Sequence, residues 1–171
     1  MHAPVEIRSG GLDTPEVVQL LGEHLRDMHV HTPPESIHAL DLESLRRPEI
    51  TFWSVWGAGG LMGCGALKEL DPGHGEIKSM RTAGAHLRKG VAARLLGHIV
   101  DEAGRRGYRR LSLETGSLAA FAPARKLYAE FGFESCAPFA AYVVDPNSEY
   151  MTLALPARGA AGERSRVLRA K

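Results

Sequence analysis

Residues 86–96 have the composition of an anion-binding loop. They read His-Leu-Arg-Lys-Gly-Val-Ala-Ala-Arg-Leu-Leu, so Gly90 follows two basic residues and precedes an apolar-periodic run. Glycine lets a ligand approach the backbone closely, and the first free N–H groups of a helix bind phosphate. No acidic residue occurs between Ile77 and Val100, whereas five basic residues do: Lys78, Arg81, Arg88, Lys89 and Arg94. Because the chain carries a net charge of only +1, we interpret this segment as a phosphate-binding site, although a solvated basic turn has the same composition.

A strand, a helix and a second strand are predicted to position this loop. Residues 76–82 are strand-like, residues 91–103 have apolar residues at helical spacing, and residues 109–115 are again strand-like. A strand–helix–strand crossover makes its two strands parallel. The loop would then lie at the carboxyl end of a strand, where open sheets bind ligands.

The remaining elements predict an α+β fold. Thr14 and Pro15 are expected to open a helix, with Thr14 as its cap, and a second helix is predicted from Glu35 to Leu45. Further strands are expected at 5–8, 50–56, 61–67 and 149–155, and a further helix at 119–131. The strands 50–56, 61–67 and 76–82 would form an antiparallel meander, in which Trp53 and Trp56 pack in or beside the sheet.

Length and composition indicate one domain, over residues 1–155, and a basic tail, over residues 156–171. The tail carries a net charge of +4, and we expect it to be disordered. Cys64 and Cys136 lack the spacing of a zinc site and are expected to be reduced. There is no signal-peptide pattern and no apolar run of membrane length, so we expect a cytoplasmic protein.

Two motifs resemble those of the Gcn5-related N-acetyltransferases (GNAT). Their acetyl-CoA loop, Gln/Arg-x-x-Gly-x-Gly/Ala, corresponds to residues 87–92, with Leu87 departing at the first position. A later motif, Asn-x-x-Ala-x-x-Leu-Tyr-x-x-x-Gly-Phe, corresponds to residues 121–133, with Phe121 in place of Asn. Other segments, including residues 75–81, 113–117 and 138–148, resemble a bacterial subgroup of this family whose acceptor is poorly defined.

The resemblance implies a mixed, mostly antiparallel sheet of six or seven strands, a central β-α-β crossover and about four helices. It also implies that acetyl-CoA is the co-substrate. Backbone groups of Met80 and Thr82, flanking Arg81, would pair with the pantetheine arm, and a backbone N–H there would polarise the thioester carbonyl. The pyrophosphate would bind at Arg88, Lys89, Gly90, Val91, Ala92 and Ala93.

The same resemblance makes Tyr128 the candidate general acid. A phenol with a pKa near 10 is protonated at neutral pH and can donate a proton to a departing thiolate. Without the motif, the sequence favours a half-buried core tyrosine at helical spacing from Ala124. Neither Cys64 nor Cys136 lies in a basic loop that would stabilise a thiolate, so we expect direct transfer and no acetyl-cysteine intermediate.

Glu76 and Glu114 are the candidate bases. Each lies within a β-rich run, where a carboxylate costs desolvation unless it faces water or has a chemical role. We place Glu76 slightly ahead because family members often carry a basic catalyst at that point of the strand. For either residue, an edge-exposed strand carboxylate is an equally good interpretation, and a chain of water molecules is another route for the proton.

The histidines near the N-terminus do not form a recognisable metal site. His24, His29, His31 and His38 lack a cysteine or a paired carboxylate that would complete one, so we expect no metal and a role in covering the acceptor site. The sequence therefore predicts an acetyl-CoA-dependent N-acetyltransferase for a small-molecule amine. We expect no nucleic-acid or membrane partner and leave a homodimer open. Two alternatives remain, a non-catalytic acyl-CoA sensor and an enzyme that acts on a protein amine.

Overall fold

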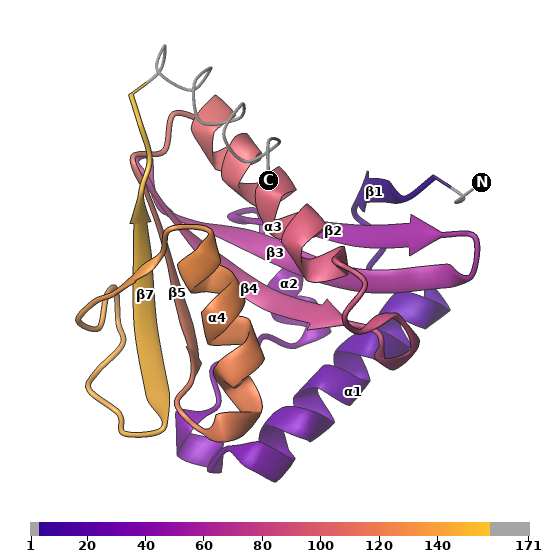
Figure 1. Cartoon of the computed structure of the whole chain (residues 1–171), viewed down its shortest axis with the longest axis horizontal. Coiled ribbons are helices and arrows are strands. Elements are labelled where there is room, and N and C mark those ends of the chain that lie inside the picture. Colours follow the sequence, from indigo (N-terminus) through magenta and orange to yellow (C-terminus); the bar gives the residue numbers. More distant parts are fainter. Residues whose placement is uncertain (1–3, 158–171) are drawn as a thin grey trace.

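A seven-stranded sheet forms the centre of the molecule in the computed structural model, which describes residues 4–157 (Figure 1). Its strand order is β1-β2-β3-β4-β5-β7-β6. The strands are β1 (Glu6–Ser9), β2 (Ile50–Gly57), β3 (Gly60–Asp71), β4 (His74–Thr82), β5 (Arg110–Gly116), β6 (Glu134–Ser135) and β7 (Ser148–Ala154). The helices are α1 (Pro15–His31), α2 (Leu42–Leu45), α3 (Val91–Arg105) and α4 (Ala122–Glu130), with short 3-10 turns η1 (Pro34–Ser36), η2 (Gly84–His86) and η3 (Ala119–Phe121).

The predicted meander and crossover are both confirmed. Strands β2, β3 and β4 pair antiparallel, whereas β4 and β5 pair parallel through the connecting helix α3. The other neighbouring pairs of the sheet are antiparallel, so this is the mixed α+β sheet that the sequence predicts.

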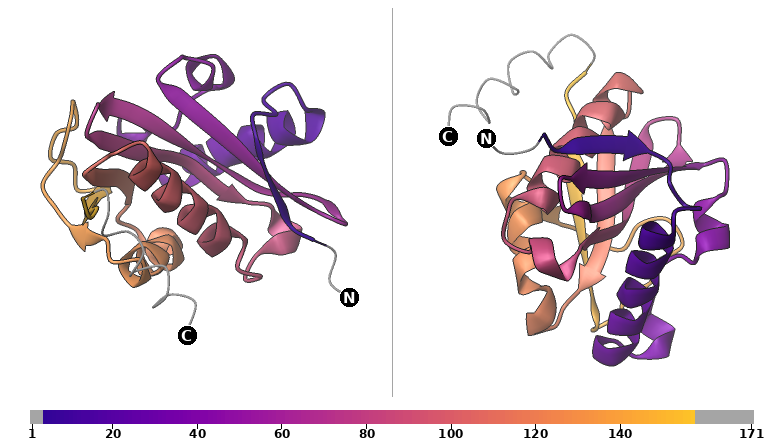
Figure 2. Two further views of the ribbon diagram at one scale, coloured as in Figure 1. Left: turned by 90° about the horizontal axis from the view of Figure 1, so that it is seen from above. Right: turned by 90° about the vertical axis from the view of Figure 1, so that its right-hand side faces the viewer.

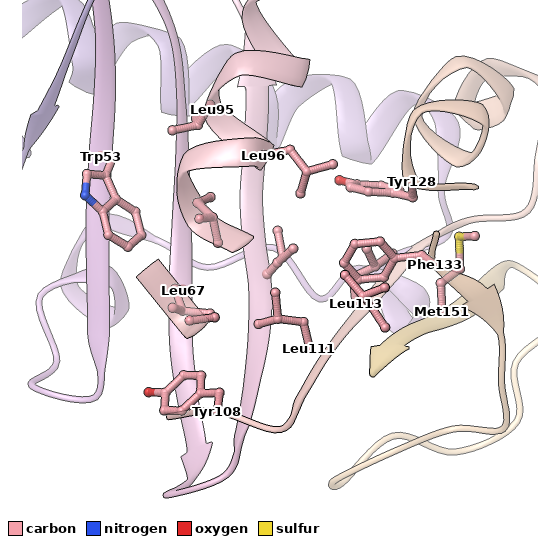
Figure 3. Close-up of a cluster of buried hydrophobic side chains, with 14 of the residues drawn as sticks. Trp53, Leu67, Leu95, Leu96, Tyr108, Leu111, Leu113, Tyr128, Phe133 and Met151 are labelled. Atoms are coloured by element: carbon pink, nitrogen blue, oxygen red, sulfur yellow. The ribbon is translucent and has the colours of Figure 1, made fainter. Parts of the chain in front are cut away.

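Helices cover both faces of the sheet (Figure 2). Helix α3 turns one apolar stripe inward, and Leu95, Leu96 and Ile99 in this stripe are buried. They pack in the larger core with residues of β5, α4 and β7, as Figure 3 shows for Leu113, Tyr128 and others. A second core lies on the opposite face, where α1 and α2 cover β2 and β3: Val17, Leu20, Leu21, Leu45, Phe52, Cys64 and Ala66. Trp53 is buried in the first core and Trp56 packs beside the second, as predicted.

The predicted helix from Glu35 to Leu45 is wrong. The chain forms the 3-10 turn η1, then an extended segment, and then the four-residue α2. Asp41 explains the late start, because its side chain accepts a hydrogen bond from the Ser44 amide at 2.8 Å and caps a new helix there. Thr14 does precede α1, but its side chain makes no capping hydrogen bond. The predicted basic tail lies outside the described residues, except for Pro156 and Ala157.

Candidate active site

The two parallel strands separate before they end. Pairing between β4 and β5 stops at Ile77 and Leu113, although β4 continues to Thr82 and β5 to Gly116. Figure 1 shows the V-shaped opening between them, and we call it the split. Its β4 side has a bulge, because Ser79 and Met80 together oppose Gly65 of β3. Ser79 has a φ of 54°, a left-handed conformation that is costly for a non-glycine residue and concentrates at functional sites.

The predicted anion-binding loop lies beside the split, at the start of α3. Gly90 precedes the helix with a φ of 77°, and a Cβ built at Gly90 would have no heavy atom within 4 Å. No side chain caps the helix, and its first turn holds no acidic residue. Arg88, Lys89 and Gly90 are exposed, so the free N–H groups of the first turn face solvent beside two cations.

Two of the five basic residues assigned to this loop serve another part of the molecule. The Lys78 ammonium lies 3.0 Å from the Glu76 carboxylate, and the Arg81 guanidinium lies 2.5 Å from Asp27 of α1. Both side chains leave β4 on the face opposite α3, because the bulge inserts one extra residue between them and so offsets the alternation that would otherwise place them on opposite faces. The positive charge at the phosphate loop therefore comes from Arg88, Lys89 and Arg94, which is a correction to the sequence analysis.

A buried charged group occupies that opposite face. Glu76 is 3% exposed and Lys78 is 9% exposed. The hydroxyl of Tyr142, on the loop before β7, donates to the Glu76 carboxylate at 2.5 Å and accepts a hydrogen bond from the Lys78 ammonium at 2.9 Å. Burial and the Glu76 charge hold the pKa of Tyr142 well above its usual range, so the phenol stays protonated. Glu76 is thus held between two donors.

Glu114 lies on the same face of the sheet, two residues along β5 from Ser112, which is the residue opposite Glu76. Within residues 4–157 it forms no ion pair. Burial raises the pKa of the Glu114 carboxyl, and the Ser148 hydroxyl and the Lys78 charge offset this in part. A carboxylate with a raised pKa is a stronger base than an exposed one.

Tyr128 lies on α4 and is buried against Phe133, with the two ring centroids 5.8 Å apart. Figure 3 shows its hydroxyl pointing toward Leu96 of α3. No residue in the range 4–157 forms a hydrogen bond with this hydroxyl. Burial is the main cause that raises the pKa of the phenol, and the negative charge of Glu114 adds to it. The phenol therefore stays protonated at neutral pH. A protonated phenol and a carboxylate thus flank the split.

Residues 16–133 match the profile of the Acetyltransferase (GNAT) family. The chain belongs to this family. The uncharacterized N-acetyltransferase YsnE of Bacillus subtilis strain 168 is 62% identical over 152 residues, which cover 89% of this chain and 98% of YsnE. The uncharacterized N-acetyltransferase YedL of Escherichia coli K12 is 50% identical, over 87% of this chain and 94% of YedL. An IAA acetyltransferase of Azospirillum brasilense is 39% identical, over 79% of this chain and 88% of that protein.

Solved GNAT structures share the fold. A GNAT acetyltransferase from Elizabethkingia anophelis with acetyl-CoA bound superposes with a TM-score of 0.63 at 17% identity, over 88% of this chain and 98% of that one. A Bacillus subtilis acetyltransferase in complex with CoA gives a TM-score of 0.67 at 17% identity, over 90% of this chain and 100% of that one. The family match and the sequence relatives make the chain an N-acetyltransferase of the GNAT family, and the two superposed structures share its fold.

In this GNAT chain, helix α1 reaches both sides of the split. Asp27 contacts Arg81 of β4, while the His31 ring lies edge-on to Phe121, which follows β5, with centroids 6.4 Å apart. Phe121 replaces the family's Asn and also covers Gly116, where an added Cβ would overlap the ring. Helix α1 therefore borders the split on the face of the sheet opposite α3. Burial and the Arg81 charge lower the pKa of its His24 to about 4, so His24 stays neutral.

The cysteines are not prepared to act as nucleophiles. Cys64 is buried, which raises the pKa of its thiol to about 12, and burial also raises the pKa of Cys136. Across residues 4–157, no cluster of three His, Cys, Asp or Glu side chains could hold a metal. In the same range, no helix is long and apolar enough to cross a membrane.

Sequence reasoning missed the role of Tyr142 and of the bulge at Ser79. Tyr142 contacts His38 as well as Glu76, with its ring centroid 4.9 Å from that of His38, and it lies 66 residues from Glu76 in sequence. No local spacing links these residues. Ser79 offers no signal either, because serine is not a residue type that favours a left-handed backbone.

Proposed function

We propose that this protein transfers the acetyl group of acetyl-CoA directly to the primary amine of a small molecule. The observation that carries the proposal is the split between β4 and β5, which has an anion-binding helix start on one side and the Glu114–Tyr128 pair beside it. The free N–H groups of Gly90, Val91, Ala92 and Ala93 would hold the pyrophosphate, with the charges of Arg88 and Lys89 beside them.

The β4 backbone would hold the rest of the co-substrate. Beyond Ile77 the N–H and C=O groups on the β5 side of β4 have no strand partner, so Met80 and Thr82 can pair with an extended pantetheine arm that adds to the sheet edge. Arg81 lies between them, and its side chain points to α1. A backbone N–H near the bulge would then polarise the thioester carbonyl.

Glu114 is the better-placed base of the two candidates. The amine nitrogen bonds to the carbonyl carbon, its proton passes to the base directly or through water, and the C–S bond breaks as Tyr128 protonates the sulfur. Glu76 already accepts hydrogen bonds from both Tyr142 and Lys78. Glu114 has a raised pKa and no ion-pair partner in the described residues, which reverses the order that the sequence favoured.

A thiol-release assay with acetyl-CoA tests the proposal. The purified protein is assayed across a panel of small primary amines and lysine peptides, beside a titration of CoA binding. Turnover of a small amine supports the proposal. CoA binding without turnover of any amine would support the sensor alternative, and turnover of peptides alone would indicate a protein acceptor.

A further inference from the structure

Two charged groups on the acceptor side of the split are incompletely paired. Glu114 on β5 has no ion-pair partner within residues 4–157. Arg81 on β4 is paired with Asp27, but its Nε is buried and has no hydrogen-bond partner there. A buried charged donor without an acceptor is destabilising, so such a group needs an explanation.

Arg81 is placed to contact an acceptor molecule. It is the second residue after the bulge at Ser79, so its backbone borders the proposed thioester site. Its side chain leaves β4 on the opposite face and lies under α1, which forms one wall of the acceptor side. Asp27 contacts only Nη2, at 2.5 Å, and so fixes the guanidinium while leaving other N–H groups free.

The chemistry of Arg81 favours a carboxylate as its ligand. A guanidinium presents its N–H groups as a planar fork that matches two carboxylate oxygens. The neighbouring His24 is neutral near pH 7, so it adds no positive charge of its own beside Arg81. Lys78, the other cation on this face, already donates to both Glu76 and Tyr142, whereas Arg81 uses only its Nη2 on Asp27, so Arg81 is the group with donors to spare.

We propose that the acceptor is an amino acid, whose carboxylate binds Arg81 while its amine is directed to the thioester and to Glu114. This inference rests on the proposed function and names its substrate class. The positive amine and the negative carboxylate of the acceptor would match the Glu114 carboxylate on β5 and the Arg81 guanidinium on β4.

Matched substrates test this inference. Each of the twenty amino acids is compared with its carboxamide, which keeps the amine and side chain but lacks the anion. We expect kcat/KM to favour the acid by about 10- to 100-fold for the preferred side chain, since hydrogen bonds to charged groups contribute about 1.5–3 kcal/mol. Arg81→Gln should bring this ratio close to one, mainly by raising KM for the acid. Arg81→Lys, which keeps the charge without the fork, should give an intermediate ratio.

Arg46→Gln is the matched control, because Arg46 forms an exposed ion pair with Asp13 at 2.7 Å, at α2. It should leave the ratio unchanged. If the wild-type protein acetylates the amide as efficiently as the acid, or if Arg81→Gln keeps the preference, the inference is overturned while amine acetylation stands.

Product binding separates the two proposals if no amine is turned over. Binding of N-acetyl amino acids and of their amides to the CoA-loaded protein is then measured by NMR. Binding that needs both the carboxylate and Arg81 would support the carboxylate site even though the proposed function had failed. Binding that is absent, or independent of Arg81, would overturn both.

Discussion

The proposed phosphate loop and the face of the sheet opposite α3, where we propose that the acceptor binds and which we call the acceptor face, are built in opposite ways. The loop is one continuous segment, residues 88–93, whose proposed binding groups are the backbone N–H groups at the start of α3. The acceptor face is assembled from side chains far apart in sequence, such as Asp27 with Arg81 and Glu76 with Tyr142, separated by 54 and 66 residues. A substitution in the phosphate loop can therefore leave the core intact. A substitution among the buried charges of the acceptor face is expected to change both substrate binding and the free energy of unfolding.

The largest effect should come from the Tyr128→Phe substitution. Loss of a general acid typically reduces turnover by about 10²–10⁴-fold. Because the Tyr128 hydroxyl forms no hydrogen bond with residues 4–157, its removal should leave the free energy of unfolding and the Kd for CoA nearly unchanged. Steady-state kinetics and urea unfolding measure the two effects.

Tyr108→Phe is the control for this prediction, since Tyr108 is also a buried core tyrosine, but its hydroxyl binds Glu69 away from the split. It should lower stability slightly and leave turnover intact. A Tyr128→Phe variant with near-normal turnover would show that Tyr128 is a packing residue only.

The second effect concerns the phosphate loop. Gly90→Glu places a side chain on a backbone with a φ of 77° and an anion at the helix start, so CoA binding should be lost. At a ligand concentration a hundredfold above Kd, wild-type stabilisation should be about 2.7 kcal/mol, and the variant should show none of it. Thermal unfolding with and without CoA measures the difference.

Gly60→Glu isolates the role of position from that of backbone strain. Gly60, the first residue of β3, has a φ of 103°, and a Cβ added there would meet open space, as it would at Gly90. This variant should be less stable but keep its full response to CoA. Equal responses from the two variants would contradict the assignment of the loop.

The phosphate loop and the acceptor face also differ in how far the sequence predicts them. The helix start at Gly90 could be predicted because glycine, flanking charge and apolar periodicity all act within a few residues. The direction of Lys78 and Arg81 could not, because it depends on which face of β4 each side chain takes on either side of a bulge at Ser79. The extended segment before Asp41 was also missed, since its capping hydrogen bond competes locally with a helix that the pattern favoured.

The third effect tests the base. Glu114→Gln should lower the rate at pH 7 by about tenfold or more, with part of the rate recovered at high pH, where the amine is deprotonated without help. Glu76→Gln should show no such recovery, because Glu76 is already held by Tyr142 and Lys78. If the profile changes for Glu76→Gln and not for Glu114→Gln, the two roles are exchanged.

The Glu114→Gln substitution should also increase the stability of the folded protein at neutral pH. Burial raises the pKa of Glu114 in the folded protein above its value in the unfolded chain. The folded protein therefore holds this proton more tightly, and its contribution to stability falls as the pH rises through the interval between the two pKa values. Glutamine cannot ionise, so Glu114→Gln should raise the free energy of unfolding at pH 7 relative to the wild type. A loss of stability there would contradict the raised pKa.

The smallest effect compares two tyrosines that bind different groups near the same loop. The Tyr142 hydroxyl donates to the buried Glu76 carboxylate, whereas the Tyr150 hydroxyl donates to the backbone oxygen of Val143 at 2.7 Å. Hydrogen bonds to charged groups contribute about 1.5–3 kcal/mol and neutral ones about 0.5–1.5 kcal/mol. Tyr142→Phe should therefore destabilise the protein by about 1 kcal/mol more than Tyr150→Phe in urea unfolding. Because Lys78 and Glu76 still neutralise each other, the fold should survive both changes. Equal losses would mean that Tyr142 only packs against its aromatic neighbours and that the buried charges of the acceptor face do not depend on this loop.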